Sequence, residues 1–212
     1  MRFDDREDAA RQLVQRLQPY AADHPLVLAI PRGGVPLGRL IADALQTDLD
    51  VVLVRKIGAP FNPEFAVGSI GESGAVFVAD HAARAGADDT YLRDEGARQL
   101  ALIRQRRAQY AKLRPAIAAT GRTVILVDDG LATGATARAA ISEIREQSPA
   151  RLVCAVPVAS EEAAAAIAPL VDAFICLYKP ADFQGVGQFY RDFEQVDDTT
   201  VCRLLAKAPV AR

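Results

Sequence analysis

The residues best suited to chemistry lie in one run, 124–136, with the sequence VILVDDGLATGAT. Its first four residues are apolar and indicate a buried strand, and two neighbouring carboxylates, Asp128 and Asp129, follow at once. A turn of small residues comes next and leads into a segment with helical periodicity. Because ligands of open α/β sheets bind beyond the carboxyl ends of the strands, we expect a binding site here.

The turn after the carboxylates suits a phosphate group. Its small side chains leave the backbone N–H groups accessible, and the start of the following helix adds a partial positive charge. Two threonine hydroxyls supply further donors. The residues that we expect to hold the phosphate are Gly130, Leu131, Ala132, Thr133, Gly134, Ala135 and Thr136.

Asp128 and Asp129 need a different role, because carboxylates would repel a phosphate. They can accept hydrogen bonds from a vicinal diol, so the turn and the carboxylates together predict a grip on a 5-phosphoribosyl group. The run contains neither G-x-x-x-x-G-K-[ST] nor G-x-G-x-x-G, the common phosphate-binding patterns. The alternative is an acidic capping turn without a ligand, which would bury two carboxylates at a cost in desolvation.

The rest of the chain alternates between strand and helix patterns, which predicts an α/β fold with about five parallel strands. Apolar runs of strand length occupy 26–30, 50–56, 123–127, 151–159 and 173–178. Segments with helical patterns occupy 5–18, 35–46, 136–147 and 161–170, with a last helix from Asp197 or Asp198.

The middle of the chain departs from this alternation. Residues 57–80 are dense in Gly and Pro, and AVGSI and AVFVA within them favour a small antiparallel arm. A long helix is predicted from Asp88 or Asp89 to about Leu113. We therefore expect one domain over 1–212, with a flap and long-helix insertion at 57–120, and a hood formed by 179–196 and the N-terminal segment.

Composition and charge exclude several classes of protein. The 212 residues are 50% hydrophobic with a net charge of -2, which argues against nucleic acid or a membrane as the main partner. The three cysteines are far apart, and the two histidines, expected to be solvated, cannot form a metal triad. No apolar stretch reaches the ~20 residues of a membrane span, and the charged start is unlike a signal peptide, so a cytoplasmic location is expected.

The run VILVDDGLATGAT resembles the 5-phosphoribosyl-1-pyrophosphate signature of the type I phosphoribosyltransferases. PRGGVPLG (31–38), RKIGAPFNPEFAVGSIGE (55–72) and VGQFYRDFEQV (186–196) resemble segments of a bacterial subfamily of these enzymes with unassigned acceptor. This resemblance implies the type I phosphoribosyltransferase fold: an α/β sheet of about five parallel strands flanked by helices, with a small hood and a flexible loop. Frequent dimers in the family also imply a homodimer.

The resemblance further implies a Mg²⁺-dependent transfer of 5-phosphoribosyl from phosphoribosyl pyrophosphate to a nucleobase or similar nitrogen nucleophile, with release of pyrophosphate. Arg32, Gly33 and Gly34 would form the pyrophosphate loop, with a cis peptide bond near Arg32–Gly33, and Lys56 would add a cation. Mg²⁺ would be held mainly by substrate oxygens. Asp128 and Asp129 would orient the ribose and contact the metal indirectly.

A reactive sugar must be shielded from water, and residues 57–74 are the expected lid. Candidate hinges are Gly58, Gly68 and Gly71. Glu64 or Glu72 is a candidate proton relay or acceptor contact, or else a solvated charge.

An aromatic-bearing loop supplies candidates for the acceptor site. Rings there could stack on a planar base and Asp182 could accept from a ring N–H, or the rings could pack the last helix onto the sheet. The aromatic candidates are Phe183, Phe189 and Tyr190.

Two alternatives to a transferase stay open. The chain could be a non-catalytic sensor that binds phosphoribosyl pyrophosphate, or a phosphoribosyl hydrolase or phosphorylase. Arg32 and Lys56 favour the enzyme, because a sensor has less need to stabilise a leaving group.

Overall fold

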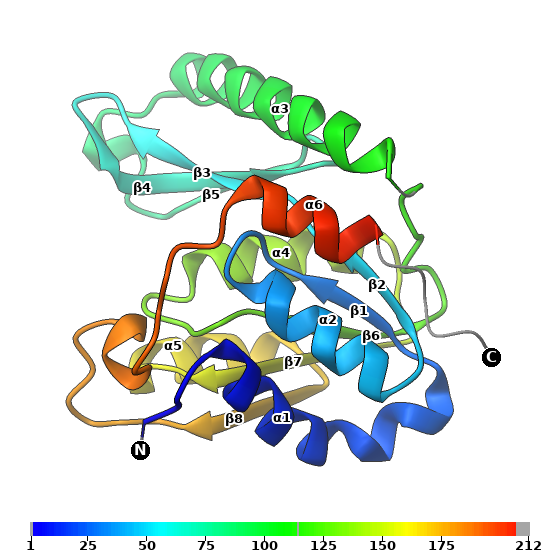
Figure 1. The fold of residues 1–212 in the computed structure, drawn as a ribbon. Coiled ribbons are helices and arrows are strands. Elements are labelled where there is room, and N and C mark those ends of the chain that lie inside the picture. The colour runs from blue at the N-terminus through cyan, green and yellow to red at the C-terminus, as the bar shows by residue number, and fades with distance from the viewer. Residues whose placement is uncertain (1, 114, 207–212) are drawn as a thin grey trace.

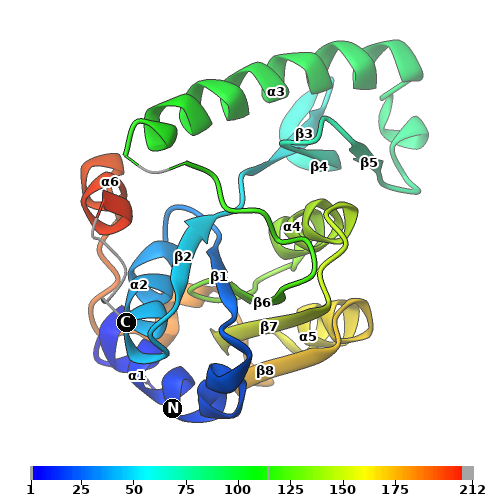
Figure 2. The same cartoon turned by 90° about the vertical axis from the view of Figure 1, so that its right-hand side faces the viewer.

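Two sheets of different kind make up the molecule, seen in Figure 1 and, turned, in Figure 2. The computed structural model describes residues 2–113 and 115–206, apart from the side chain of Glu64. The larger sheet is parallel throughout and confirms the expected five strands. In spatial order its strands are β2 (Asp48–Val51), β1 (Leu26–Ala29), β6 (Thr123–Val127), β7 (Arg151–Val158) and β8 (Ala173–Tyr178).

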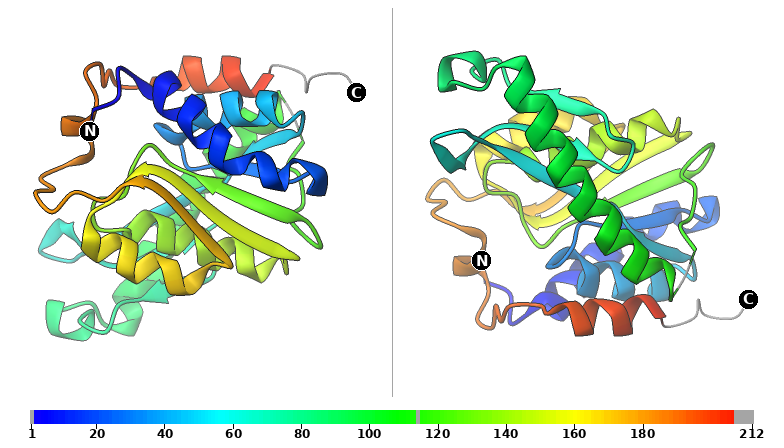
Figure 3. Two further views of the ribbon diagram at one scale, coloured as in Figure 1. Left: turned by 90° about the horizontal axis from the view of Figure 1, so that it is seen from below. Right: turned by 90° about the horizontal axis from the view of Figure 1, so that it is seen from above.

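Helices cover both faces of the parallel sheet, as the view from below in Figure 3 shows. On one face lie α1 (Arg6–Leu17), α2 (Gly34–Ala44) and α6 (Asp198–Ala206), and on the other lie α4 (Ala135–Glu146) and α5 (Glu161–Ile167). Short 3₁₀ helices occupy Gln18–Asp23, Ala83–Ala85, Ala168–Leu170 and Val186–Phe189.

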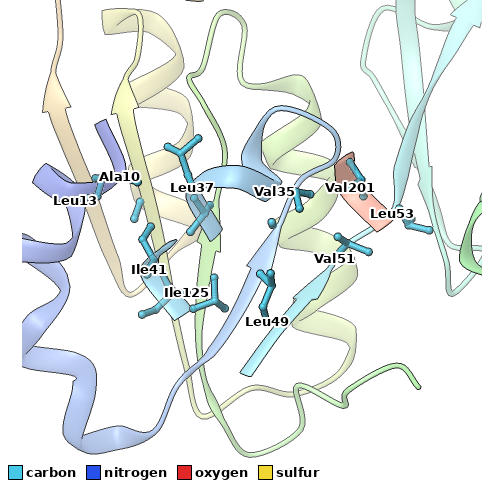
Figure 4. Packing of buried hydrophobic residues seen from close by; sticks show 14 of the residues in the cluster. Ala10, Leu13, Val35, Leu37, Ile41, Leu49, Val51, Leu53, Ile125 and Val201 are labelled. Carbon is cyan, nitrogen blue, oxygen red and sulfur yellow. The ribbon is translucent and has the colours of Figure 1, made fainter. Parts of the chain in front are cut away.

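The strand period of two divides the apolar residues between two cores. Val27 and Ile125 belong to the core beneath α1 and α2, whereas Leu28 and Leu126 belong to the core beneath α4 and α5. Figure 4 shows the first core, where α2 side chains such as Ile41 meet strand side chains. Because both faces of the central strands are buried, β1 and β6 have almost continuously apolar sequences, LVLA and TVILV.

Capping residues set where the helices begin. Asp5 caps α1 by accepting a hydrogen bond from the Asp8 backbone N–H at 2.7 Å. Ser160 caps α5 in the same way through the Ala163 N–H. The Asp5 cap places Arg6 in the first turn of α1, at the end of the helix nearest the carboxyl edge of the sheet.

The strand expected over 50–56 is wrong in extent: it is two strands in two different sheets. β2 ends at Val51, and after Val52 and Leu53 the chain starts β3 (Val54–Ala59) of the small sheet. Val52 and Leu53 are buried at this crossing, so the apolar run continues through it and hides the break.

The small antiparallel sheet joins β3 to β4 (Asn62–Gly71) and β5 (Val76–Val78), in the order β3-β4-β5. Its β4–β5 pairing sets Gly68 opposite Val78, which confirms the expected arm. We call residues 54–78 the flap.

The long helix α3 (Asp89–Ala111) lies across the flap on the side away from the parallel sheet (Figure 2). It packs apolar side chains such as Ile103 into the core. Near its end Arg107 donates to the Glu72 and Asp50 carboxylates and to the Val51 carbonyl. Arg107 thereby joins α3 to Asp50 and Val51 at the end of β2 and to Glu72, the residue just after β4.

Among the described residues, no helix is both long and apolar enough to span a membrane.

Candidate functional site

The two carboxylates lie where β6 ends, beside the loop that follows β1. The Asp129 backbone N–H donates to Asp128 Oδ1 at 2.9 Å, so the pair is locally fixed. The loop approaches so closely that a Cβ on Gly33 would lie 2.0 Å from Asp129 Oδ2, and one on Gly34 would lie 2.6 Å from the Val127 carbonyl oxygen. The two glycines are therefore needed for contact with the carboxylate loop itself.

The cis peptide bond of this loop joins Pro31 to Arg32. It lies one bond earlier than the Arg32–Gly33 position named from the sequence.

Arg6 forms the ion pair of the site, and it is a residue that the sequence reasoning missed. Its Nε and Nη2 donate to Asp129 Oδ2 at 3.0 and 2.8 Å, and its Nη1 donates to the Glu194 carbonyl at 2.7 Å. The guanidinium also lies over the Phe193 ring, 4.0 Å from its centroid. The Arg6 and Asp129 side chains are only 12% and 15% exposed, so the pair is screened little by water.

Nothing local in the sequence links Arg6 to Asp129, because 123 residues separate them. A bridge between Phe3 and Tyr190 brings the N-terminal segment to the carboxyl edge of the sheet, and the Tyr190 hydroxyl donates to the Asp129 carbonyl at 2.6 Å.

Burial raises the pKa of Asp128 well above its usual value, and the neighbouring charge of Asp129 raises it further. Burial also raises the pKa of Asp129, while the Arg6 guanidinium lowers it. Arg6 thus supplies the counter-charge that favours an ionised carboxylate at Asp129.

The turn after the carboxylates has the shape expected for an anion site. Gly134, with φ 74°, is the N-cap residue of α4 and offers no side-chain acceptor, while the Ala135 N–H donates to Thr133 Oγ1 at 3.4 Å. Thr133 and Thr136 are exposed at the turn. Leu131 differs from the expectation: its N–H already donates to the Val158 carbonyl at 2.9 Å and its side chain is buried, so it anchors the turn.

Two cavities flank this region. The hood pocket, of about 450 Å³, is lined by Arg6, Arg32, Gly33, Asp129, Val186, Phe193, Gln195 and Val196. The flap pocket, of about 610 Å³, lies between the flap and the start of α4. Its lining is Val54, Arg55, Lys56, Phe65, Ala66, Gly68, Ser69, Phe77, Ala79, His81, Thr133, Ala135, Thr136, Arg138 and Ala139.

The structure separates the two cations that were expected together. Lys56 lies on β3 and lines the flap pocket, whereas Arg32 lines the hood pocket. An Arg32 Nη1 atom lies 3.9 Å from Asp198 Oδ2, the same oxygen that lies 3.7 Å from Arg106 Nη2.

The expected stacking role of Phe189 and Tyr190 is not what the structure shows. Both rings are buried: Phe189 packs against Tyr178 and Phe183, and Tyr190 packs against Phe3. They hold the 186–193 segment to the sheet, which is the packing alternative noted above. Asp182 is exposed and Phe183 half-buried, and neither lines the hood or flap pocket.

The expected relay and hinge residues also take other roles. Glu72 pairs with Arg107 rather than facing the site, and the side chain of Glu64 lies outside the described residues. The hinge candidates lie within or at the end of paired strands, where a Cβ would collide with the neighbours: Gly58 with Pro63, Gly68 with Phe77 and Gly71 with Glu143.

His81, expected to be solvated, is half-buried. Its Nε2 lies 3.0 Å from the Ala66 carbonyl oxygen and its ring centroid lies 4.9 Å from that of Phe65. His81 therefore shapes one wall of the flap pocket.

The described residues contain no group of three or more His, Cys, Asp or Glu side chains that could hold a metal. Asp128 and Asp129 are the carboxylates nearest the turn, and Asp129 is already paired with Arg6. This donor set fits Mg²⁺ carried by phosphate-rich substrate oxygens, since Mg²⁺ keeps several waters and needs few protein ligands.

Comparisons with known proteins agree with this arrangement. A family model described as "Phosphoribosyl transferase domain" matches residues 3–191. Two Mycobacterium tuberculosis proteins, from strains CDC 1551 and H37Rv, are named "Putative phosphoribosyl transferase" and are each 44% identical over 207 residues. That match covers 97% of this chain and 47% of each relative, so the chain spans about half the length of the curated relatives it matches.

Among solved structures, TT1426 from Thermus thermophilus has a TM-score of 0.86 and 46% identity, covering 97% of this chain and 98% of that chain. A hypothetical protein from Neisseria gonorrhoeae, solved with bound ppGpp, has a TM-score of 0.51 and 11% identity, covering 97% of this chain and 93% of that chain. This second likeness concerns the fold alone.

Proposed function

The chain belongs to the phosphoribosyl transferase domain family, and from this premise we propose that it transfers a 5-phosphoribosyl group from phosphoribosyl pyrophosphate to a small nitrogen nucleophile. One observation carries the proposal. The Asp128–Asp129 pair, the turn that ends at the Gly134 N-cap of α4 and the Gly33–Gly34 loop converge at the carboxyl ends of β1 and β6. Carboxylates for the ribose hydroxyls, a turn for the 5-phosphate and a loop for the pyrophosphate would then lie side by side.

In the proposed step, a nitrogen lone pair of the acceptor forms a bond to the anomeric carbon of the ribose. The bond from that carbon to the pyrophosphate oxygen breaks, and pyrophosphate leaves with the electron pair. The acceptor nitrogen then loses its proton to water. Charge therefore moves onto pyrophosphate during the step, and donors placed there accelerate it.

The residues of this chain have separate parts in that step. Asp128 and Asp129 accept hydrogen bonds from the ribose hydroxyls, and the turn from Gly130 to Thr136, apart from the Leu131 N–H, donates to the 5-phosphate. Arg32 and the Gly33 N–H bind the pyrophosphate, with Lys56 as a further cation from the flap, while the Gly34 N–H donates to the Ile30 carbonyl at 3.0 Å. Mg²⁺ bound to the substrate would neutralise pyrophosphate charge, and the two carboxylates would contact it at most through water.

The organisation of the whole chain is part of the proposal. Residues 1–212 act as one phosphoribosyltransferase domain, with 57–120 as the flap and long-helix insertion and 179–196 plus the N-terminal segment as the hood. A cytoplasmic enzyme that works as a homodimer is the predicted setting, and light scattering tests the oligomeric state.

The test is a screen of nucleobases and small amines with labelled phosphoribosyl pyrophosphate and Mg²⁺, which measures pyrophosphate release. We expect release that depends on one acceptor and is lost in the double variant Asp128→Asn with Asp129→Asn. Tight binding of phosphoribosyl pyrophosphate without release for any acceptor would instead favour the sensor. Release that needs no acceptor but water would favour the hydrolase.

A further inference from the structure

The turn that follows β4 joins the flap to both α3 and α4. We call residues 71–74 the flap turn, and a backbone hydrogen bond of 3.2 Å joins its first and last residues. Arg107 of α3 donates to the Glu72 carboxylate at 2.6 Å. The next residue, Ser73, donates to Glu143 of α4. The flap is therefore anchored at this turn by two helices that lie on different sides of it in Figure 2.

The contact with α4 is made by a buried carboxylate. Glu143 is only 7% exposed. Its Oε1 accepts from the Ser73 backbone N–H at 2.8 Å, and its Oε2 accepts from the Ser73 hydroxyl at 2.6 Å. A Cβ on Gly71 would lie 2.0 Å from Glu143 Oε2, so the end of β4 also approaches the carboxylate directly. Both carboxylate oxygens are thus occupied by one residue of the flap turn.

The charge of Glu143 is offset by hydrogen bonds. None of the ion pairs within the described part of the chain includes Glu143. Burying a charged group costs free energy unless hydrogen bonds compensate for the lost water. If the flap turn moved away, Glu143 would lose both of its donors in a poorly solvated place. The contact therefore favours a flap that stays in one position.

Helix α4 carries both this contact and part of the proposed phosphate site. It starts within the turn from Gly130 to Thr136, which we place on the 5-phosphate. Glu143 lies two helical turns after Thr136, roughly 10 Å further along the axis and on the same face. Figure 2 shows α4 beneath the flap, and α4 packs on β3 and β4. Because one helix carries both points, the contact at Glu143 fixes the flap relative to the 5-phosphate.

We propose that Glu143 is a positioning residue for the transfer, which holds the flap beside the 5-phosphate as a fixed wall of the site. The inference rests on the proposed function and adds to it how Lys56, on the flap, keeps its distance from the sugar. It replaces the lid expected over 57–74 with a segment that is in place before substrate binds. The hinge candidates of that segment are packed against their neighbours, which agrees with a fixed wall.

The experiment compares variants of the whole chain. Glu143→Met removes both acceptors, keeps a side chain of similar length and removes the cost of burying a charge, so the fold should persist. Glu143→Gln keeps an oxygen that can accept from Ser73. The matched control is Glu146→Met, because Glu146 is exposed on the same helix.

Hydrogen exchange followed by mass spectrometry measures whether the flap is held. In Glu143→Met the backbone amides of β4 and β5 should exchange about tenfold or more faster than in the wild type. In Glu143→Gln and Glu146→Met they should exchange much as in the wild type. Equal exchange in the wild type and Glu143→Met would overturn the inference. Strong slowing confined to the flap when substrate is added to the wild type would also overturn it, because it would reveal a lid that closes.

Calorimetry with two ligands separates positioning from a general loss of structure. Ribose 5-phosphate reaches only the turn and the carboxylates, whereas phosphoribosyl pyrophosphate with Mg²⁺ also reaches the cation of the flap. Glu143→Met should bind phosphoribosyl pyrophosphate about fivefold or more weakly and ribose 5-phosphate as the wild type does, and Glu143→Gln should restore most of the affinity. Equal losses for both ligands, or no loss for either, would overturn the positioning role.

The two measurements also separate this inference from the proposed function. If the wild type does not bind phosphoribosyl pyrophosphate, the proposed function fails, and exchange without ligand still tests whether Glu143 holds the flap. If the wild type binds it and Glu143→Met binds it equally well, the function stands and the role of Glu143 is wrong.

Discussion

The contact between Arg6 and Asp129 joins the start of α1 to the loop after β6, at the point where we place the ribose. Two nitrogens of the partly buried guanidinium donate to the same oxygen, Asp129 Oδ2, and the guanidinium also packs on Phe193. Lysine would keep the charge but lose the forked geometry and the flat packing. Arg6 is thus a positioning residue, which acts on the substrate through Asp129.

Arg6→Met should raise the pKa of Asp129, because the guanidinium now lowers it. The carboxylate would then protonate at higher pH, so the acid limb of phosphoribosyl pyrophosphate binding should move to higher pH. Calorimetry over a series of pH values measures this shift. Arg11→Met is the control, because Arg11 lies on the same helix and its side chain is 60% exposed. Identical pH profiles for wild type and Arg6→Met would contradict the positioning role.

Asp128 should reduce the stability of the fold at neutral pH. Burial raises its pKa in the folded protein above the ordinary value of 3.8. A group of this kind contributes stability below pH 3.8, which is lost as the pH rises through the folded-state pKa. We therefore expect Asp128→Asn to melt at a higher temperature than the wild type at neutral pH, and the difference to close as the pH falls toward 3.8.

Thermal denaturation at several pH values checks this prediction. A wild type and an Asp128→Asn variant with equal melting temperatures at neutral pH would show that the carboxylate carries no burial cost.

The residue scale also shows where sequence reasoning ends. Asp128, Asp129 and the turn could be predicted as a site from the sequence, because they follow one another in a strand–turn–helix pattern. Arg6 could not be found in the same way, because its contact with Asp129 comes from the packing of distant segments. Phe189 and Tyr190 were candidates by type alone, and their burial makes them packing residues.

At the scale of elements, the alternation of strand and helix was readable from apolar runs and caps. The antiparallel arm was also readable, from its glycines and its two apolar stretches. The break between β2 and β3 was not, because the crossing residues Val52 and Leu53 are as buried as the strand residues before them. A local sequence pattern indicates whether a residue is buried, but it does not indicate which sheet the strand joins.

The attachment of α3 and the flap to the parallel sheet depends on Arg107. It holds the Glu72 and Asp50 carboxylates and the Val51 carbonyl, and its side chain is only 18% exposed. Removing it would leave two acidic groups without their partner in a poorly solvated place.

Arg107→Ala should lower the free energy of unfolding by about 3 kcal/mol. Arg104→Ala, an exposed position on the same helix, should change it by less than about 0.5 kcal/mol. Urea denaturation followed by circular dichroism compares the two. Equal effects of both variants would mean that the Arg107 cluster does not hold the flap.

At the scale of the whole molecule, the carboxyl edge of the parallel sheet lies between two separate parts of the chain. The N-terminal segment and residues 186–196 form the hood pocket, and the flap with α4 forms the flap pocket. A substrate with a phosphate, a diol and a pyrophosphate would extend along this edge. The likeness to TT1426 over 97% of the chain indicates that the flap and α3 are part of the shared fold.

The most direct test is calorimetric titration of phosphoribosyl pyrophosphate with Mg²⁺ into the wild type and into Asp128→Asn with Asp129→Asn. If both carboxylates hold the ribose hydroxyls, the double variant should bind more weakly by roughly 2–4 kcal/mol. An affinity unchanged by the two substitutions would contradict the claim that this edge of the sheet grips a phosphoribosyl group.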